Sequence, residues 1–196
     1  MRRRLPFFAA ALAAALLGAC SSTPSSSFYT LQPDATLTPE GAAAPVTVVV
    51  GPVTIPELVD RPQFVTRLGD NQVSLNEFSR WAEPLRGDIQ RVIAADLAEL
   101  LGTDRVNVYD TTSAGQSVWR VRVDVMQFDS ALGQAATVEA LWTITPPKKG
   151  TPVLGHTLAH EAVAGQGYDA LVVAHDRALA AVSRDIAAAI RANLAQ

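Results

Sequence analysis

Residues 118–127 alternate between apolar and polar side chains, and this alternation constrains the fold more than any other feature of the sequence. Side chains of a β-strand point alternately to opposite faces of its sheet, so a period of two places one set toward a core. The inward set is Trp119, Val121, Val123 and Val125. The chain must therefore build a sheet with a buried face, and other elements must cover that face.

Further stretches have the composition of β-strands. Residues 46–53 form a nearly continuous β-branched run, which is typical of a strand buried on both faces. Residues 64–68 and 72–76 flank a Gly-Asp-Asn turn and predict a hairpin. Residues 135–145 and 153–164 are two further strands, joined by a turn that contains proline and glycine.

Two segments carry apolar residues at helical spacing. The first is expected to start near residues 81–83, because Pro84 suits a first helical turn, and to end before Gly102. The second spans about residues 169–194. The order of strands, helix, strands and helix predicts a single α+β domain, with a largely antiparallel sheet and two amphipathic helices packed on one face. The other face of the sheet is then partly uncovered.

The first twenty residues are typical of a bacterial lipoprotein signal. Arg2, Arg3 and Arg4 precede an apolar run of about 13 residues, whereas a membrane-spanning helix needs about 20. The following Leu-Gly-Ala-Cys20 resembles the lipobox, in which the cysteine thiol is diacylated and the chain is cleaved just before the cysteine. Cys20 is the only cysteine, so it cannot form an internal disulfide. The alternative is an ordinary signal peptide with an incidental cysteine.

The residue after the cysteine indicates the destination by the same resemblance. An aspartate there favours retention in the inner membrane, whereas this chain has Ser21. We therefore expect an outer-membrane lipoprotein that faces the periplasm and is held by its lipid.

The chain divides into three parts. Residues 1–19 are the signal peptide, residues 20–45 carry the lipidated Cys20 and a mostly flexible tether with a short β patch at 28–31, and residues 46–196 form the α+β domain. Three arginines leave with the signal peptide, so the net charge of −3 for the whole chain becomes −6. This acidic charge argues against nucleic acid as a partner, because a nucleic-acid site needs cations to displace counterions from phosphate.

The residue types that carry catalysis or bind metals are few. His156 and His160 are four residues apart in an expected strand, where they would be about 13 Å apart and could not share one metal ion. His175 is expected on the surface of the last helix. Glu57 and Asp60 could pair as general acid and base, but a local pairing of Asp60 beside Arg61 is favoured. We expect no enzymatic activity, no cofactor and no metal.

Residues 50–67 form a corner with three prolines: Pro52, Pro56 and Pro62. Each proline removes a backbone N–H, so a central strand is not expected to continue through them. A stiff exposed loop loses little entropy on binding and suits a contact surface, although it could equally serve only to turn the chain.

Two blocks of sequence carry a resemblance to a known family. The first runs from Val50 to Gln63 and contains Ile-Pro-Glu-Leu-Val-Asp-Arg-Pro-Gln, and the second is Arg-Trp-Ala-Glu-Pro-Leu at residues 80–85. With the lipobox and Phe-Tyr-Thr-Leu at residues 28–31, they resemble the PqiC family of ABC-type transport auxiliary lipoproteins. The chain departs from the family at Leu58, where many members have an aromatic residue.

The resemblance implies a non-enzymatic outer-membrane lipoprotein that supports envelope integrity. Its partner would be an MCE-domain protein anchored in the inner membrane, which carries phospholipid or other hydrophobic molecules across the periplasm. An assembly lipoprotein of another outer-membrane machine is the alternative, and a lipoprotein hydrolase is a weaker one. We also expect a homo-oligomer, because the uncovered sheet face needs a partner. The residues expected to contact a partner or a neighbouring subunit are Pro56, Asp60, Arg61, Pro62 and Trp81.

Overall fold

The computed structural model describes residues 25–39, 41–109, 117–147 and 150–194. In chain order, the elements are β1 (Ser27–Tyr29), β2 (Thr47–Thr54), β3 (Gln63–Arg67), β4 (Val73–Trp81), α2 (Leu85–Leu101), β5 (Val106–Asn107), β6 (Val118–Ala131), β7 (Ala135–Thr145), β8 (Val153–Ala162) and α3 (Gly167–Leu194). The signal peptide and Cys20 lie outside the described residues, so their roles stay predictions.

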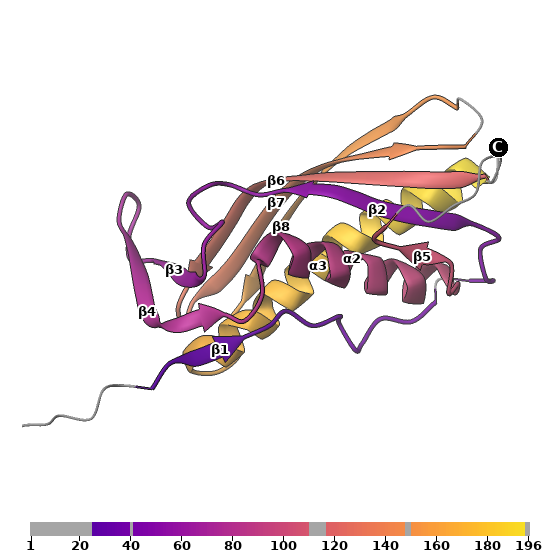
Figure 1. Cartoon of the computed structure of the whole chain (residues 1–196). Helices are drawn as coiled ribbons and strands as arrows, with labels where there is room; N and C mark the ends of the chain where they lie inside the picture. Colours follow the sequence, from indigo (N-terminus) through magenta and orange to yellow (C-terminus); the bar gives the residue numbers. More distant parts are fainter. Residues whose placement is uncertain (1–24, 40, 110–116, 148–149, 195–196) are drawn as a thin grey trace, which may run out of the picture.

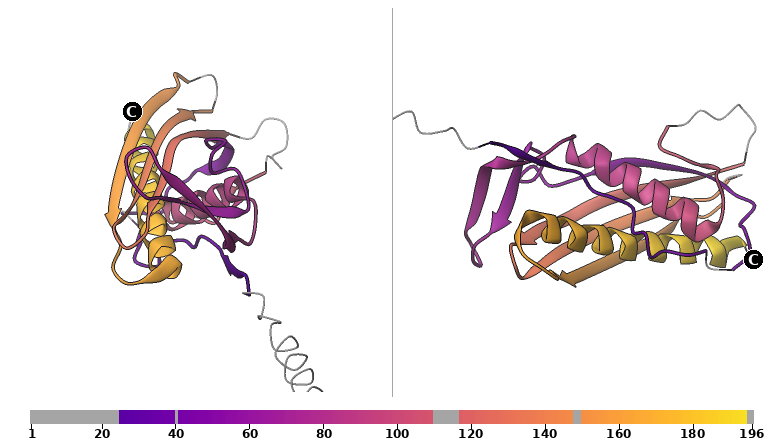
Figure 2. Two further views of the ribbon diagram at one scale, coloured as in Figure 1. Left: turned by 90° about the vertical axis from the view of Figure 1, so that its left-hand side faces the viewer. Right: turned by 90° about the horizontal axis from the view of Figure 1, so that it is seen from below.

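The strands form two sheets. A five-stranded sheet has the order β5-β2-β6-β7-β8, and a three-stranded sheet at one end of the molecule has the order β1-β4-β3 (Figure 1). Both α2 and α3 lie on the same side of the five-stranded sheet, as the view from below shows (Figure 2). The predicted single α+β domain with two helices on one face is confirmed.

The strand directions are more mixed than the expected largely antiparallel sheet. The hairpins β3–β4, β6–β7 and β7–β8 are antiparallel, but β2 pairs parallel with β5 and β6, and β1 pairs parallel with β4. The reason is topological. The chain between β2 and β6 contains α2, and a crossover through a helix returns the chain in the same direction.

The core lies between the five-stranded sheet and the helices. Its largest fully buried side chains include Ile89, Ile93 and Leu97 of α2 and Leu171 and Ile186 of α3. The predicted inward set of β6, from Trp119 to Val125, is buried as well. The opposite face of this sheet exposes Leu141, Leu154 and Leu158 to solvent. No helix among the described residues is both long enough and apolar enough to span a lipid bilayer.

Pro52 lies inside β2, whereas we expected the strand to end before it. The Gly51–Pro52 peptide bond is cis, and the pairing with β6 shifts register between Val50 and Val53. On its other side β2 pairs with β5 only at Val48 and Val49. At Pro52 the strand is therefore a local edge with an irregular register, where a missing N–H breaks no ladder bond.

Residues 30–39, which we call the strap, lie across the two helices (Figure 2). Leu31 and Leu37 are buried. Three backbone N–H groups of the strap donate to carboxylates of the helices: Leu31 to Asp88 at 2.7 Å, Gln32 to Asp176 at 2.9 Å, and Asp34 to Asp96 at 3.2 Å. We expected a mostly flexible tether up to residue 45, but the packed structure begins at β1, because these helix carboxylates satisfy the strap backbone.

His175 is fully buried, whereas we expected it on the surface of the last helix. Its ring stacks on Phe128 at a centroid distance of 4.0 Å, and its Nε2 lies 2.7 Å from Ser130 Oγ. Burial lowers the pKa of His175 to about 3, so the ring is neutral at neutral pH. The histidine belongs to the apolar stripe of α3 and joins that helix to β6.

Candidate functional site

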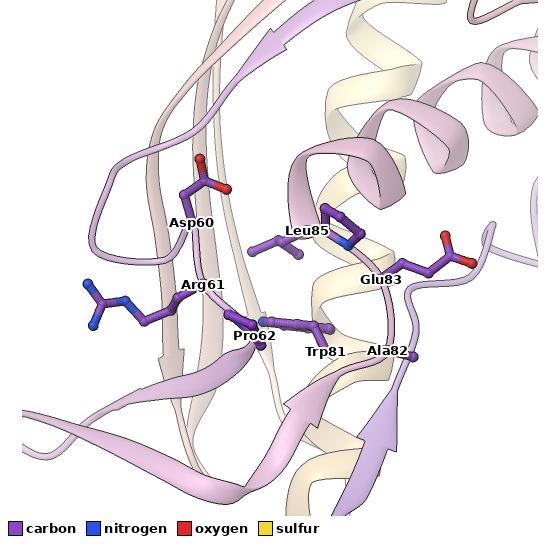
Figure 3. A pocket seen from close by; sticks show the side chains of 8 residues that line it. Asp60, Arg61, Pro62, Trp81, Ala82, Glu83 and Leu85 are labelled. Carbon is purple, nitrogen blue, oxygen red and sulfur yellow. The ribbon is translucent and has the colours of Figure 1, made fainter.

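The proline corner and the start of α2 enclose an open pocket with a volume of about 340 Å³ (Figure 3). The pocket is lined by Asp60, Arg61, Pro62, Trp81, Ala82, Glu83, Pro84 and Leu85. Four of the five predicted contact residues are therefore brought together around one cavity. The fifth, Pro56, lies in a second cavity of about 280 Å³ beside β6.

The corner is held in shape by its own backbone. The N–H groups of Val59 and Asp60 both donate to the carbonyl of Pro56, at 3.0 and 3.2 Å, and Arg61 N–H donates to Val59 O at 2.8 Å. The Val59 side chain is buried. Because both its backbone and its central side chain are fixed, the corner presents a preformed surface.

Trp81 is a core residue that also forms a wall of the pocket. It is 5% exposed and stacks on Phe64 at a centroid distance of 4.3 Å. We expected Trp81 at the entrance of a helix, but it is the last residue of β4, and α2 begins at Leu85. The backbone N–H of Trp81 donates to Pro62 O at 2.8 Å, so the end of β4 is fixed against the corner.

The charges around the pocket pair differently from our expectation. Asp60 forms an ion pair with Arg86 in the first turn of α2, instead of the local pairing beside Arg61 that we expected. Both partners are solvent-accessible, so the pair contributes at most about 1 kcal/mol. The guanidinium of Arg61 points away from the pocket (Figure 3), and its buried Nε makes no hydrogen bond in the structure.

The walls of the pocket are largely apolar. Trp81, Pro62, Pro84 and Leu85 supply apolar walls, and its charged groups do not combine a nucleophile with a base. Within the described parts of the chain, no group of three His, Cys, Asp or Glu side chains could hold a metal ion.

The histidines pair locally elsewhere. His156 lies 2.8 Å from Glu139 and His160 lies 2.8 Å from Thr137, all on the exposed face of β7 and β8. Ser130 and His175 form a buried pair that no substrate can reach.

Some residues of the site were missing from the sequence-based prediction. Ala82, Glu83, Pro84 and Leu85 line the pocket, and Arg86 pairs with Asp60. The sequence carried a signal for these residues, because they belong to or adjoin the block from Arg80 to Leu85 that resembles the PqiC family. The expectation placed the start of a helix there, although Arg80 and Trp81 end β4 and only Ala82, Glu83 and Pro84 connect it to α2.

Fold and site together define a two-layer α+β domain with an open pocket, and residues from both sequence blocks line that pocket. The family model for the ABC-type transport auxiliary lipoprotein component matches residues 29–187. The chain belongs to this family, which confirms the PqiC-like resemblance of the two blocks. Members of this family are lipoproteins that serve as auxiliary components of ABC-type transport. Because they are lipoproteins, membership implies an anchor in the cell envelope.

Two solved structures share the fold. A crystal structure of an uncharacterized protein is 20% identical, with a TM-score of 0.68 over 85% of this chain and 99% of that one. A protein from Xanthomonas campestris is 17% identical, with a TM-score of 0.64 over 82% of this chain and 92% of that one. No curated protein matches the sequence.

Proposed function

We propose that the chain is an outer-membrane lipoprotein that docks an MCE-domain assembly of an intermembrane lipid transport system and thereby supports envelope integrity. It acts without catalysis or cofactor. Acylated Cys20 holds it to the periplasmic face of the outer membrane. The partner is the MCE-domain protein anchored in the inner membrane, which spans the periplasm and carries the lipid.

One observation carries the docking role. Two blocks, residues 55–63 and 80–85, lie 17 residues or more apart in sequence, yet residues from both line one preformed pocket. The apolar walls suit an aliphatic or aromatic side chain of a partner, and charged side chains at the rim suit polar contacts around it.

The exposed face of the five-stranded sheet supports self-association as a second part of the proposal. Leu141 of β7 is opposite His156 of β8, and Leu154 and Leu158 lie two residues to either side of that histidine, so the three exposed leucines share one face and are diagonal neighbours. A soluble domain rarely leaves adjacent leucines uncovered, so a second copy of this chain is the expected cover. A homo-oligomer would also present several docking pockets to one partner assembly.

The docking role is tested by filling the pocket without disturbing the core. Ala82 lines the pocket and is exposed, so Ala82→Trp should block the pocket and leave the melting temperature unchanged. We expect binding of the purified lipoprotein to the periplasmic part of the MCE protein to weaken by about tenfold or more, which corresponds to about 1.4 kcal/mol. Ala164→Trp is the matched control, because Ala164 is exposed and outside the pocket.

Trp81→Ala is a poor substitute for this test. Removing a buried indole costs about 3–5 kcal/mol of stability, so a loss of binding would reflect unfolding. If Ala82→Trp binds the MCE protein as the wild type does, the pocket is not the contact. Purification of the lipoprotein with another outer-membrane machine, and without an MCE protein, would favour the assembly alternative.

A further inference from the structure

The three-stranded sheet carries exposed apolar side chains at the end of the molecule where the N-terminal segment leaves it (Figure 1). Phe28 on β1 is 63% exposed, Leu68 at the hairpin end is 62% exposed and Phe78 on β4 is 45% exposed. Leu68 N–H donates to Gln72 O at 2.9 Å, which closes the hairpin with the leucine at its tip.

The outward position of Phe78 is built into the strand. The pairing of β3 with β4 passes directly from Asn76 to Arg80, so three residues of β4 have no partner on β3. The Asn76 side chain fixes this irregularity, because its Oδ1 accepts bonds from the N–H groups of Phe78 and Ser79, both at 2.8 Å. Ser79 is consequently buried while Phe78 faces solvent.

The chain connects this end of the molecule directly to the anchor. Six residues lie between Cys20 and Ser27, so the two are seven chain steps apart, which a fully extended chain spans in at most about 24 Å. Ser27 pairs with Ser79 and Phe28 with Arg80, so Phe28 and Phe78 lie on neighbouring strands. An anchor this close holds these side chains at a high effective concentration near the lipid surface.

A lipid surface suits these apolar side chains better than a charged surface would. Aromatic and leucine side chains enter the headgroup region of a bilayer, and each buried apolar group adds to the hold of the anchor. The exposed leucines that suit self-association belong to the other sheet, on β7 and β8. These are two separate sets of exposed apolar side chains, and of the two it is the set on the three-stranded sheet that adjoins the tether.

We infer that the three-stranded sheet rests on the membrane that holds the anchor, with Phe28, Leu68 and Phe78 inserted among the lipid headgroups. This inference rests on the proposed acylation of Cys20. The contact orients the domain, because it fixes one end on the bilayer and turns the opposite end, which carries the start of β8, toward the periplasm (Figure 1).

The test uses the full chain purified from membranes with its anchor. Acylation blocks the Cys20 thiol, so a cysteine introduced elsewhere is the only one free for labelling. Phe78→Cys and Leu68→Cys are labelled with an environment-sensitive fluorophore and reconstituted in vesicles of phosphatidylethanolamine and phosphatidylglycerol that contain a nitroxide lipid as quencher. All three labelled variants also carry Leu158→Glu, which keeps the face of β7 and β8 free of a second copy. Leu154→Cys is the matched control, because Leu154 is 77% exposed and lies at the far end of the sheet.

We expect lipid quenching of the labels at positions 68 and 78 to exceed that at position 154 by about threefold or more, with a blue-shifted emission. Equal quenching at positions 78 and 154 in acylated protein would overturn this inference alone. Purified protein without acyl mass would overturn both the anchor and this inference. Binding to the MCE protein is measured separately, so failure of the docking proposal is distinguishable from either result.

Discussion

Replacing Asp176 by Asn should stabilise the domain at neutral pH, although the substitution removes a carboxylate that accepts a hydrogen bond from the strap. Asp176 is 8% exposed and accepts the Gln32 N–H bond at 2.9 Å. Burial raises the pKa of Asp176 from 3.8 to about 7, and the neighbouring Asp96, Asp88 and Asp34 add to the increase. Burial likewise raises the pKa of Asp96 to about 6.

A carboxyl group with a raised pKa binds its proton more tightly in the folded protein than in the unfolded chain. Its contribution to the free energy of unfolding is therefore complete below about pH 4 and is lost as the pH rises to about 7. The shift from 3.8 to about 7 corresponds to about 4 kcal/mol at most. Solvent screening reduces this figure, and an amide oxygen accepts a weaker bond from Gln32 than a carboxylate does. We expect Asp176→Asn to gain about 2 kcal/mol at pH 8 and nothing at pH 4.

The assay is urea unfolding followed by tryptophan fluorescence at several pH values between these limits. Asp104→Asn is the control, because Asp104 is exposed and should change stability at neither pH. A variant that is less stable than the wild type at pH 8 would refute the reasoning. The ionised carboxylate would then hold the strap more strongly than burial destabilises it.

Three further predictions concern the anchor, the core and the exposed sheet face. Cys20→Ala should leave an unacylated chain that no longer fractionates with the outer membrane; intact fractionation without acyl mass would contradict the anchor. Gly155→Ala should cost about 1–3 kcal/mol and change the near-ultraviolet circular dichroism, because an added Cβ would lie 2.0 Å from Trp142 Cζ2. Gly87→Ala, on the exposed side of α2 with open space around it, should instead raise stability by about 0.5–1 kcal/mol. Light scattering should give a mass well above one subunit for the wild type and a lower mass for Leu158→Glu; a monomeric wild type at micromolar concentration would count against self-association.

The regular elements could be predicted because the spacing of their apolar residues shows directly which side chains are buried. In β6 the alternation marks the strand face that packs on the core, and in α2 and α3 the apolar stripe marks the helix face that does so. Pro52 was misjudged because its tolerance depends on how far β5 extends along β2, which no local pattern encodes.

The strap was missed for a different reason. It has no periodic pattern, since its backbone is satisfied by side chains from distant helices. The helices themselves carry the signal, because Asp88, Val92 and Asp96 follow one another at four-residue spacing on the buried stripe of α2. A carboxylate on a buried stripe needs a hydrogen-bond donor, so these aspartates indicated that another segment must cover them. The same reasoning applies to Asp176 beside the buried His175.

The position of β1 determines which residues would transmit a pulling force between the membrane anchor and a bound partner. Tension on the tether enters at Ser27, and β1 is bonded to the end of β4, where Ala82 N–H donates to Tyr29 O at 2.8 Å. Ala82 and Trp81 also line the pocket. A pull between the anchor and a partner held in that pocket therefore crosses only a few residues at one end of the domain. Under the proposed docking, most of the five-stranded sheet lies outside that path, so tension between partner and membrane would be borne mainly by the end of the domain that carries β1 and β4.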